Sequence, residues 1–386
     1  MYTWEANTTT MNSIISKSTK ITYRGVIKPL FFKQKPDSTH QFILQLGKTF
    51  QRLFGAKTTL YKIWAYDNPS ILGQTLRGIV FRNPVGLSAG FDKNFELPPI
   101  MRSIGFGFME GGSLTHQPCD GNPKPWFHRL PNSKSLVVNV GLANQGVTAI
   151  INRLERFPRS LFRDFPLNIS VAKTNSPVAS TDRDAIADYV GSLRAIGTAG
   201  VGDMITLNIS CPNAYGGEPF TTPTRLDRLL TQVDAIKLVQ PVFVKMPSDL
   251  NWEAFDKLLA VIARHRIAGV TISNLAKDRN QLKLKDLLPD DIKGNLSGKP
   301  TWALSNKLIR LTYRKYNRRF VIIGVGGIFS AEDAYAKIRY GANLVELVTG
   351  LIFEGPQLIG QINRGLVDLL HKDGFSNVSE AVGVDA

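Results

Sequence analysis

Cysteine is scarce in this chain of 386 residues, which contains only Cys119 and Cys211. Two cysteines cannot build a disulfide framework, and neither stands at a spacing typical of metal ligands. We therefore predict no metal site and a reducing compartment. Either cysteine can be a small buried apolar residue or a reactive thiol.

Long apolar runs are missing as well. No stretch of about 18 or more apolar residues occurs, so the sequence predicts no transmembrane helix. The N-terminus also lacks the apolar core and the cleavage site of a signal peptide.

Acidic residues are few, since 31 Asp and Glu stand against 47 Lys and Arg and the formal net charge is +16. Such a charge suits nucleic acid, an anionic membrane surface or acidic small molecules as partners. No helix-turn-helix, zinc-finger or RNA-binding aromatic motif occurs, so we expect no nucleic acid partner.

The N-terminal region differs in composition from the rest, with a boundary near residues 68–78. Residues 1–66 hold ten Lys or Arg against two acids. We expect residues 1–20 to be disordered and residues 21–70 to form a helical extension. Apolar residues at three- and four-residue steps predict one amphipathic helix from Asp37 or Ser38 to Gly55 and a second over Thr58–Tyr66. These helices can pack onto the main domain or lie on a membrane.

From Pro84 onward, short apolar segments alternate with helical patterns such as Asp182–Ile196, Arg225–Lys237, Trp252–Arg266 and Ala331–Tyr340. Eight such units predict an α/β fold, a (β/α)8 TIM barrel over residues 78–375 followed by a tail at 376–386. An open doubly wound sheet is the alternative, but no Gly-x-Gly-x-x-Gly follows the first strand. The predicted strands are Val85–Gly90, Phe108–Ser113, Asn168–Lys173, Met204–Ser210, Val242–Met246, Gly269–Asn274, Phe320–Gly327 and Leu344–Gly350.

Polar residues gather where these strands end, at the face on which a barrel assembles its active site. The glycines of Gly324-Val325-Gly326-Gly327 and Thr349-Gly350 predict a phosphate cradle after strands seven and eight. Lys245 would point into the barrel, and it requires either a permanent anionic ligand or a structural carboxylate partner. Asn139, Asn144, Asn168, Asn208, Asn213 and Asn274 suit a planar ligand with alternating donors and acceptors.

Cys211 lies between Ser210 and Pro212 in the loop after the fourth predicted strand. A thiol has an ordinary pKa near 8.5 and is partly thiolate at neutral pH, which suits removal of a proton next to a carbonyl. Cys119, in a Gln-Pro-Cys-Asp-Gly turn, has no comparable setting.

Several segments together resemble the dihydroorotate dehydrogenase family over about residues 21–370. They are Asn83–Asn94, Gly121–Pro125, Asn208–Asn213, Leu296–Pro300, Ile323–Ile328 and Thr349–Pro356. The resemblance implies FMN as cofactor, dihydroorotate and orotate as ligands, and Cys211 as the catalytic base that takes the proton from C5 while C6 delivers hydride to the flavin.

The resemblance also implies the binding residues. For FMN they are Ala89, Gly90, Lys93, Ser113, Asn168, Asn208, Lys245, Ser273, Gly298, Gly327, Val348 and Thr349. For the pyrimidine they are Lys93, Asn139, Gly141, Leu142, Asn208, Asn213 and Asn274.

The N-terminal helices, with Asp37, His40 and Phe42 in the first turn, resemble those of the membrane-associated class that reduces quinone. This implies a quinone as electron acceptor and no iron–sulfur subunit. It further implies a position peripheral to the cytoplasmic side of the cell membrane, or at the mitochondrial inner membrane in a eukaryote.

The chain departs from the family pattern at three places. The quinone class has serine where Cys211 stands, and cysteine is typical of the soluble classes, so a soluble fumarate-linked enzyme is the alternative. The family's Asn-x-Met-Gly is Val138-Asn139-Val140-Gly141 here, with the asparagine displaced by one position. A threonine after the substrate-binding asparagine is replaced by Leu275. The last two departures leave open an FMN-binding barrel without turnover.

Overall fold

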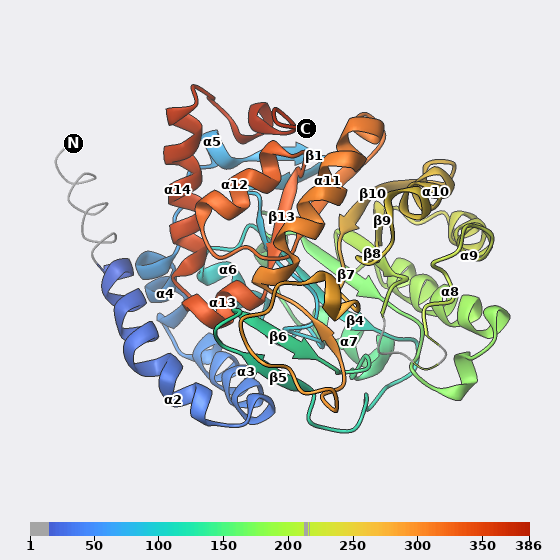
Figure 1. Cartoon of the computed structure of the whole chain (residues 1–386), viewed down its shortest axis with the longest axis horizontal. Helices are drawn as coiled ribbons and strands as arrows, with labels where there is room; N and C mark the ends of the chain where they lie inside the picture. The colour runs from blue at the N-terminus through green and yellow to red at the C-terminus, as the bar shows by residue number, and fades with distance from the viewer. Residues whose placement is uncertain (1–14, 212–214, 216) are drawn as a thin grey trace.

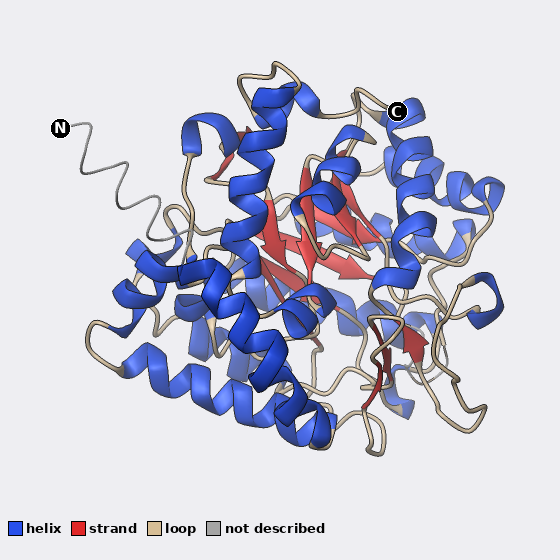
Figure 2. Cartoon of the chain, turned by 60° about the vertical axis from the view of Figure 1, so that its left-hand side comes forward, coloured by secondary structure: helices blue, strands red, loops and turns tan. Residues whose placement is uncertain are grey.

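Eight parallel strands close into a barrel at the centre of the computed structural model, which describes residues 15–211, 215 and 217–386 (Figures 1 and 2). The first and last of these strands pair with each other, which excludes the open sheet and confirms the predicted barrel. All eight predicted strands are present, each ending close to the polar residues that follow it. They are β3 (Val85–Leu87), β4 (Phe108–Leu114), β7 (Leu167–Val171), β8 (Met204–Asn208), β9 (Val242–Lys245), β10 (Ile267–Ile272), β12 (Val321–Val325) and β13 (Leu344–Leu347).

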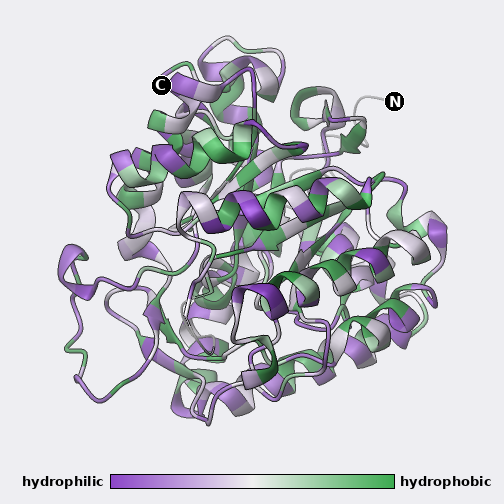
Figure 3. Cartoon of the chain, turned by 90° about the vertical axis from the view of Figure 1, so that its right-hand side faces the viewer, coloured by the Kyte–Doolittle hydropathy of each residue, from purple (hydrophilic) through white to green (hydrophobic). Residues whose placement is uncertain are grey.

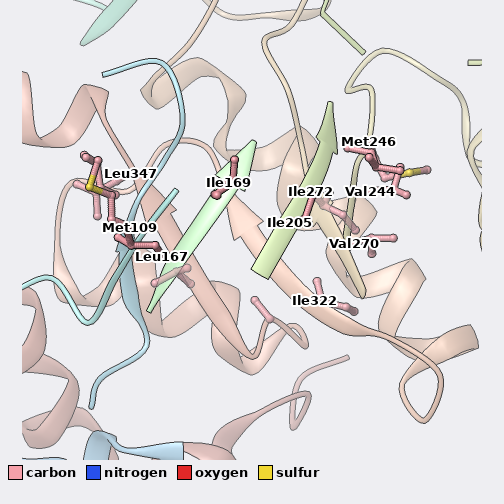
Figure 4. Close-up of a cluster of buried hydrophobic side chains, with 14 of the residues drawn as sticks. Met109, Leu167, Ile169, Ile205, Val244, Met246, Val270, Ile272, Ile322 and Leu347 are labelled. Atoms are coloured by element: carbon pink, nitrogen blue, oxygen red, sulfur yellow. The ribbon is translucent and has the colours of Figure 1, made fainter. Parts of the chain in front are cut away.

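Alternate residues of each barrel strand point inward and outward. The outward residues are apolar and form the core between strands and helices, as Figure 4 shows for Met109, Ile169, Ile205, Val244 and Ile322. These side chains are fully buried, and each contributes roughly 1.5–3 kcal/mol by leaving water. The core therefore lies mainly outside the barrel wall.

The inward residues change in polarity along the barrel axis. The end where the strands begin is closed by an antiparallel hairpin of β1 (Gln74–Leu76) and β2 (Ile79–Phe81). Phe81 packs edge-to-face on Phe108, in a cluster with Met204, Phe243 and Leu344. Two residues further along the strands, the inward positions are occupied by charged and polar side chains, which begin the site described below.

Helices surround the barrel, and Figure 3 shows hydrophobic and hydrophilic stripes along those of one side. The predicted and observed bounds of the four helices named from the sequence agree within three residues. Helix α8, for example, follows the N-cap Thr181, whose side chain accepts a hydrogen bond from the Asp184 N–H. It ends before Gly200, which has a φ of +63°. The chain's last residues pack against the barrel through the buried Val378 and Ala381 of η6 (Val378–Ala381). The helices are α5 (Pro69–Leu72), α6 (Pro98–Ser103), α7 (Gly146–Leu154), α8 (Asp182–Ala199), α9 (Pro223–Ile236), α10 (Trp252–Ala263), α11 (Trp302–Tyr316), α12 (Ala331–Arg339), α13 (Thr349–Glu354) and α14 (Leu358–Lys372), with short 3-10 turns at Arg159–Phe162, Pro177–Ala179, Arg279–Gln281 and Lys299–Thr301.

The two predicted helices of the extension are α3 (Pro36–Arg52) and α4 (Ala56–Trp64), which lie beside the barrel at the lower left of Figure 1. The predicted cap was wrong, because α3 begins at Pro36 and Asp37 instead accepts a hydrogen bond from the Trp126 N–H. Gly55, at φ +76°, separates the two helices.

The expected disorder of residues 1–20 does not hold for residues 15–20, which are helical; residues 1–14 lie outside the described part of the chain. This helix continues through η1 (Tyr23–Ile27) and α2 (Lys28–Lys33). Tertiary hydrogen bonds hold it, since the amide of Gln361 donates to Ser16 and the Trp64 indole N–H donates to Thr19. The sequence did not reveal this helix because Gly25 and Pro29 interrupt its apolar spacing.

A three-stranded antiparallel sheet covers the barrel face where the strands end. It consists of β5 (Phe127–Leu130), β6 (Ser135–Val138) and β11 (Asn295–Leu296) in the order β11-β6-β5. Its strands come from the long connections after β4 and β10, and sequence analysis did not predict them. Its strand β5 contacts α3, and residues of all three strands line the site described below.

Candidate active site

One cavity of about 500 Å³ lies at the ends of the barrel strands and continues beneath the N-terminal extension. Its inner part is lined by residues that follow β3, β4, β8, β10, β12 and β13. Its outer part is lined by apolar side chains of the extension, among them Ile43, Leu60 and Trp64. This is the face on which barrel enzymes assemble their catalytic groups.

The turn after β12 has the geometry of a phosphate cradle. Gly326 and Gly327 have φ values of +109° and +74°, which side-chain-bearing residues rarely adopt. A Cβ at Gly327 would lie 2.4 Å from the Cβ of Trp302, and one at Gly326 would lie 2.7 Å from Thr301 Oγ1. Glycine is therefore required at both positions, and it leaves backbone N–H groups accessible to an anion.

Lys245, the last residue of β9, lines the inner end of the cavity. Its Nζ lies 3.7 Å from Glu110 Oε2 and donates a hydrogen bond of 3.4 Å to Ser88 Oγ. The sequence left open either an anionic ligand or a structural carboxylate as its partner. The carboxylate is present, and the ammonium also faces the cavity, so the two alternatives do not exclude each other.

Amide and hydroxyl groups form a connected network beside Lys245. Asn208 Nδ2 donates to Ser113 Oγ at 2.8 Å, and the Ser113 and Ser170 hydroxyls lie 2.8 Å apart. Asn274 Nδ2 donates to Asn208 Oδ1 at 3.0 Å and to the Ser210 carbonyl at 2.7 Å. The network holds Asn208 and Asn274 together at the cavity, where their amides can recognise a planar polar ligand.

Cys211 lies directly after this network, lines the cavity and is not part of a disulfide. The loop preceding it is held by the Tyr189 hydroxyl, which donates to the Asn208 carbonyl at 2.8 Å. Burial lowers the pKa of the neighbouring Lys173, whereas the charges of Cys211 and Asp188 raise it. A thiol close to an ammonium group is suited to abstract a proton.

Lys93 lines the cavity beside His40 of α3. Burial lowers the pKa of Lys93 to about 8, and the charges of Asp92 and Asp37 oppose this shift. Its Nζ lies 3.4 Å from His40 Nε2 and 5.5 Å from the centre of the Phe127 ring. Burial, and to a smaller extent the charge of Lys93, lower the pKa of His40 to about 3. His40 is therefore neutral, and its Nε2 can accept the hydrogen bond from Lys93.

Most of the residues predicted for the site line this one cavity. They come from seven of the eight barrel strands or the loops after them, and from the segment between β6 and α7. They are Ala89, Gly90, Lys93, Ser113, Gly141, Leu142, Asn208, Cys211, Lys245, Ser273, Asn274, Gly298, Gly327, Val348 and Thr349.

Three predicted residues do not line it. The amide of Asn144 instead donates a hydrogen bond to the Thr115 hydroxyl at 2.7 Å. Asn168 is fully buried inside the barrel, where its side chain exchanges hydrogen bonds with the Thr206 hydroxyl at 2.8 and 3.1 Å. The Asn139 amide is directed to Asn122 instead, and Val138 takes the position at the cavity. Alternate residues of a strand face opposite sides, so a displacement by one residue moved the asparagine away. Asn213 lies outside the described residues.

Sequence analysis missed the contribution of the first helix to the site. The Tyr23 hydroxyl donates to the Ile352 carbonyl at 2.7 Å, and Arg24 forms an ion pair with Glu354. Arg129 of β5 lines the same end of the cavity. These residues are brought in by tertiary packing, and no spacing in the sequence indicates them.

The sequence profile of the dihydroorotate dehydrogenase family matches residues 71–370, which include the whole barrel and the cradle. The chain belongs to the dihydroorotate dehydrogenase family. Members of this family are flavin-dependent oxidoreductases. The match begins after the extension, so it concerns the catalytic barrel.

Relatives that include the extension are also similar over nearly their whole length. The protein of Crocosphaera subtropica is 36% identical over 367 residues, which are 92% of this chain and 95% of the relative. That of Deinococcus deserti is 35% identical over 94% of this chain and 100% of the relative, and that of Parvibaculum lavamentivorans is 37% identical over 93% and 97%. All three relatives are named dihydroorotate dehydrogenase (quinone).

Two crystal structures of DHODH from Eimeria tenella are similar in fold. The complex with ferulenol has a TM-score of 0.79 at 27% identity and covers 91% of this chain and 95% of its own. The ligand-free structure has a TM-score of 0.79 at 28% identity and covers 91% of this chain and 99% of its own. The likeness therefore extends from the barrel into the N-terminal helices.

Within residues 15–211, 215 and 217–386, no helix combines the length and the apolar character needed to cross a membrane.

Proposed function

We propose that this protein oxidises dihydroorotate to orotate in de novo pyrimidine biosynthesis, with FMN as cofactor and a quinone as electron acceptor. One observation supports the proposal most directly. A single cavity joins the polar network around Asn208 and Cys211 to the apolar inner faces of α3 and α4. A polar reductant and an apolar oxidant can therefore reach one cofactor from opposite ends.

The cavity residues fit FMN. The N–H groups at Gly326 and Gly327 would bind its phosphate, with Gly298 and Thr349 beside them; a Cβ at Gly298 would lie 2.8 Å from Thr349 Cγ2. Lys245 would face the polar edge of the isoalloxazine ring and stabilise negative charge there. FMN supplies the group that accepts two electrons from the substrate and passes them on.

Dihydroorotate would bind between Lys93, Asn208 and Asn274. The Lys93 ammonium is suited to a carboxylate, and the two amides offer donors and acceptors to the pyrimidine edge. Val138 and Leu275 also line this part of the cavity, so fewer polar groups face the substrate than the family pattern predicts. We therefore expect orotate to be held chiefly by Lys93, Asn208 and Asn274.

Cys211 would act as the base that removes the C5 proton of the substrate. Lys173 would place positive charge beside the sulfur, which favours the loss of its proton. The proton would then be released to solvent from the loop after β8.

The quinone would enter through the extension. The outer part of the cavity is lined by Ile43, Leu46, Phe50, Leu60 and Trp64, which suit an apolar ring and tail. Large apolar side chains also remain exposed on the extension, Phe54 in the turn between α3 and α4 most of all. Together with the basic residues of the extension, they favour a peripheral position on an anionic membrane surface.

The proposal is tested with the purified holoprotein under anaerobic conditions. Dihydroorotate should bleach the visible absorption of the bound flavin, and a ubiquinone analogue should restore it. A flavin that stays oxidised with dihydroorotate would contradict the proposed oxidation. Turnover with fumarate, and none with the ubiquinone analogue, would instead assign the protein to the soluble type that Cys211 suggests.

A further inference from the structure

Two acidic residues are buried inside the barrel directly below the cavity. Glu110 of β4 and Glu346 of β13 are both fully buried, two positions along their strands from the inward-facing Phe108 and Leu344. None of their four carboxyl oxygens has a partner at ideal hydrogen-bond geometry among the described residues, and Glu346 interacts with Glu110, Ser88 and Lys245 in a way that shifts its pKa. Branched apolar side chains ordinarily fill this level of a barrel, so a pair of acids here has a considerable energetic cost.

The pair is connected to the cavity. Glu346, Lys245 and Ser88 line the cavity, whereas Glu110 lies behind them. The ammonium of Lys245 stands 3.7 Å from Glu110 Oε2. The three charged groups therefore form one cluster, which a ligand in the cavity would contact through Lys245 and Glu346.

The charges of this cluster do not balance when both acids are ionised. Burial raises the pKa of Glu346 well above its ordinary value, the charge of Glu110 raises it further, and Lys245 opposes the shift. Lys245, from β9, is the cation that faces the pair in the described structure. The residues at neighbouring positions of β3, β7 and β10 carry no charge; they are Ser88, Asn168 and Thr271. One proton shared by the two carboxyl groups makes the cluster neutral.

We propose that Glu110 and Glu346 share one proton while the flavin is oxidised, and bind a second proton from solvent when the flavin is reduced. Oxidation of the substrate would supply two electrons and one proton to a bound flavin, and Lys245 would face the resulting single negative charge. That charge competes with Glu110 for the ammonium. An O–H bond formed on the remaining carboxylate removes the excess charge from a site that water cannot screen. The substrate's other proton leaves separately through Cys211.

This inference rests on the proposed function, because it requires a flavin in the cavity. It is tested by spectroelectrochemical titration of the bound flavin between pH 6 and pH 9, with electrons supplied by the electrode. Each proton taken up with two electrons changes the reduction potential by about 30 mV per pH unit. We expect about 60 mV per pH unit for the natural protein and about 30 mV for the double variant Glu110→Gln/Glu346→Gln.

A matched control is Asp203→Asn, which removes a carboxyl group that accepts a hydrogen bond from the Leu167 N–H at the opposite end of the barrel. This variant should keep the slope of the natural protein. An equal slope in the natural protein and the double variant would overturn the inference, because the second proton would then reside on the flavin. A slope of about 30 mV in the natural protein would overturn it as well.

Infrared difference spectroscopy of the natural holoprotein tests the same step if the double variant does not fold. Reduction of the flavin should increase the C=O absorption of protonated carboxyl groups, and Glu346→Gln should alter that band. No increase would overturn the inference. Since the electrode replaces dihydroorotate in both measurements, a flavin that titrates normally but does not react with dihydroorotate contradicts only the proposed function.

Discussion

Cys211 combines two requirements of a base that acts on a carbon acid. It lies at the cavity, close to Asn208 and Asn274, which would hold the substrate. It also has an ammonium group nearby, that of Lys173, which favours a negatively charged sulfur. The Lys173 side chain is held in turn by the Tyr215 carbonyl. Replacing Cys211 alone therefore tests its role as the base, because the neighbouring Asn208, Asn274 and Lys173 remain in place.

Cys211→Ala should slow flavin reduction by dihydroorotate at least about 100-fold, the usual contribution of a positioned base, while FMN stays bound. Cys211→Ser should retain part of the rate with its optimum at higher pH, since a hydroxyl is a weaker acid than a thiol. Anaerobic stopped-flow absorbance measures both. Cys119→Ala is the matched control and should react at the normal rate. Unchanged reduction in the Cys211→Ala variant would exclude the cysteine as base.

Lys337 shows how a buried cation affects stability away from the active site. It is fully buried in α12 and donates hydrogen bonds to Ser305 Oγ and Asn306 Oδ1 of α11. Burial lowers the pKa of Lys337 to about 7, against the opposing charge of Asp333. Between about pH 7 and the ordinary pKa near 10.4, the unfolded chain binds a proton that the folded chain does not. The free energy of unfolding therefore rises with pH in this window.

Lys337→Met should remove that pH dependence. Relative to the variant, the natural protein should gain about 2–3 kcal/mol in free energy of unfolding between pH 7 and pH 9, because one pKa unit corresponds to about 1.4 kcal/mol. Urea titrations at the two pH values measure the gain. The exposed Lys307 provides the control, since Lys307→Met should leave the gain in free energy of unfolding between pH 7 and pH 9 unchanged. A difference between natural protein and Lys337→Met that is independent of pH would contradict the prediction.

At the scale of elements, α3 is docked on the barrel by a few specific contacts. His40 packs against the rings of Phe91 and Phe127 at centroid distances of 5.3 and 5.6 Å. Gly47 permits close approach to α6, since a Cβ there would lie 2.8 Å from Leu97 Cδ2. Docking of α3 closes the cavity on one side, so its stability controls access to the outer chamber.

Docking of α3 should weaken at acidic pH. The folded-state pKa of His40, about 3, lies below its ordinary value of 6.5, so stability is fully present above pH 6.5 and is lost as the pH falls toward 3. At pH 5 the loss is at most about 2 kcal/mol, or roughly 30-fold more frequent opening. Limited proteolysis within residues 36–64 should accelerate at pH 5 relative to pH 7.5. His40→Leu should show no such change, after correction for protease activity; an equal acceleration in this variant would assign the effect to other groups.

At the scale of the whole molecule, exposed apolar side chains and excess positive charge coincide on the extension. Nine of the large apolar residues that remain exposed lie there: Ile21, Val26, Ile27, Leu30, Phe42, Leu46, Phe50, Leu53 and Phe54. The segment up to residue 66 also holds ten basic residues against two acids. Apolar insertion and attraction to anionic headgroups add, so both should contribute to membrane binding.

The protein should therefore float with vesicles that contain anionic phospholipid, and binding should weaken as salt is raised. Phe54→Asp should reduce the bound fraction severalfold, because it places a charge at the most exposed apolar position. Val239→Asp is the matched control, since Val239 is nearly as exposed but precedes β9 at the opposite end of the barrel. Equal loss of binding in both variants would refute the assignment of the extension as the membrane-binding surface.

The barrel and most of the cavity residues follow from local patterns along the chain. Parallel strands all end at one face, so polar residues that follow successive strands, such as Lys93, Asn208 and Asn274, must converge there. The phosphate cradle also depends on a short segment of the chain, because the backbone conformation of one turn requires glycine at positions 326 and 327.

Which side chains face the ligand, and what closes the site, depend on how distant segments pack together. The tertiary structure turned Asn139 toward Asn122 and placed Val138 at the cavity, a choice that depends on strand register rather than composition. It brought the helix of residues 15–33 and the three-stranded sheet over the barrel face. It also set Glu110 beside Glu346, although the two are separated by more than half of the chain. Such contacts depend on long-range packing, which no local periodicity encodes.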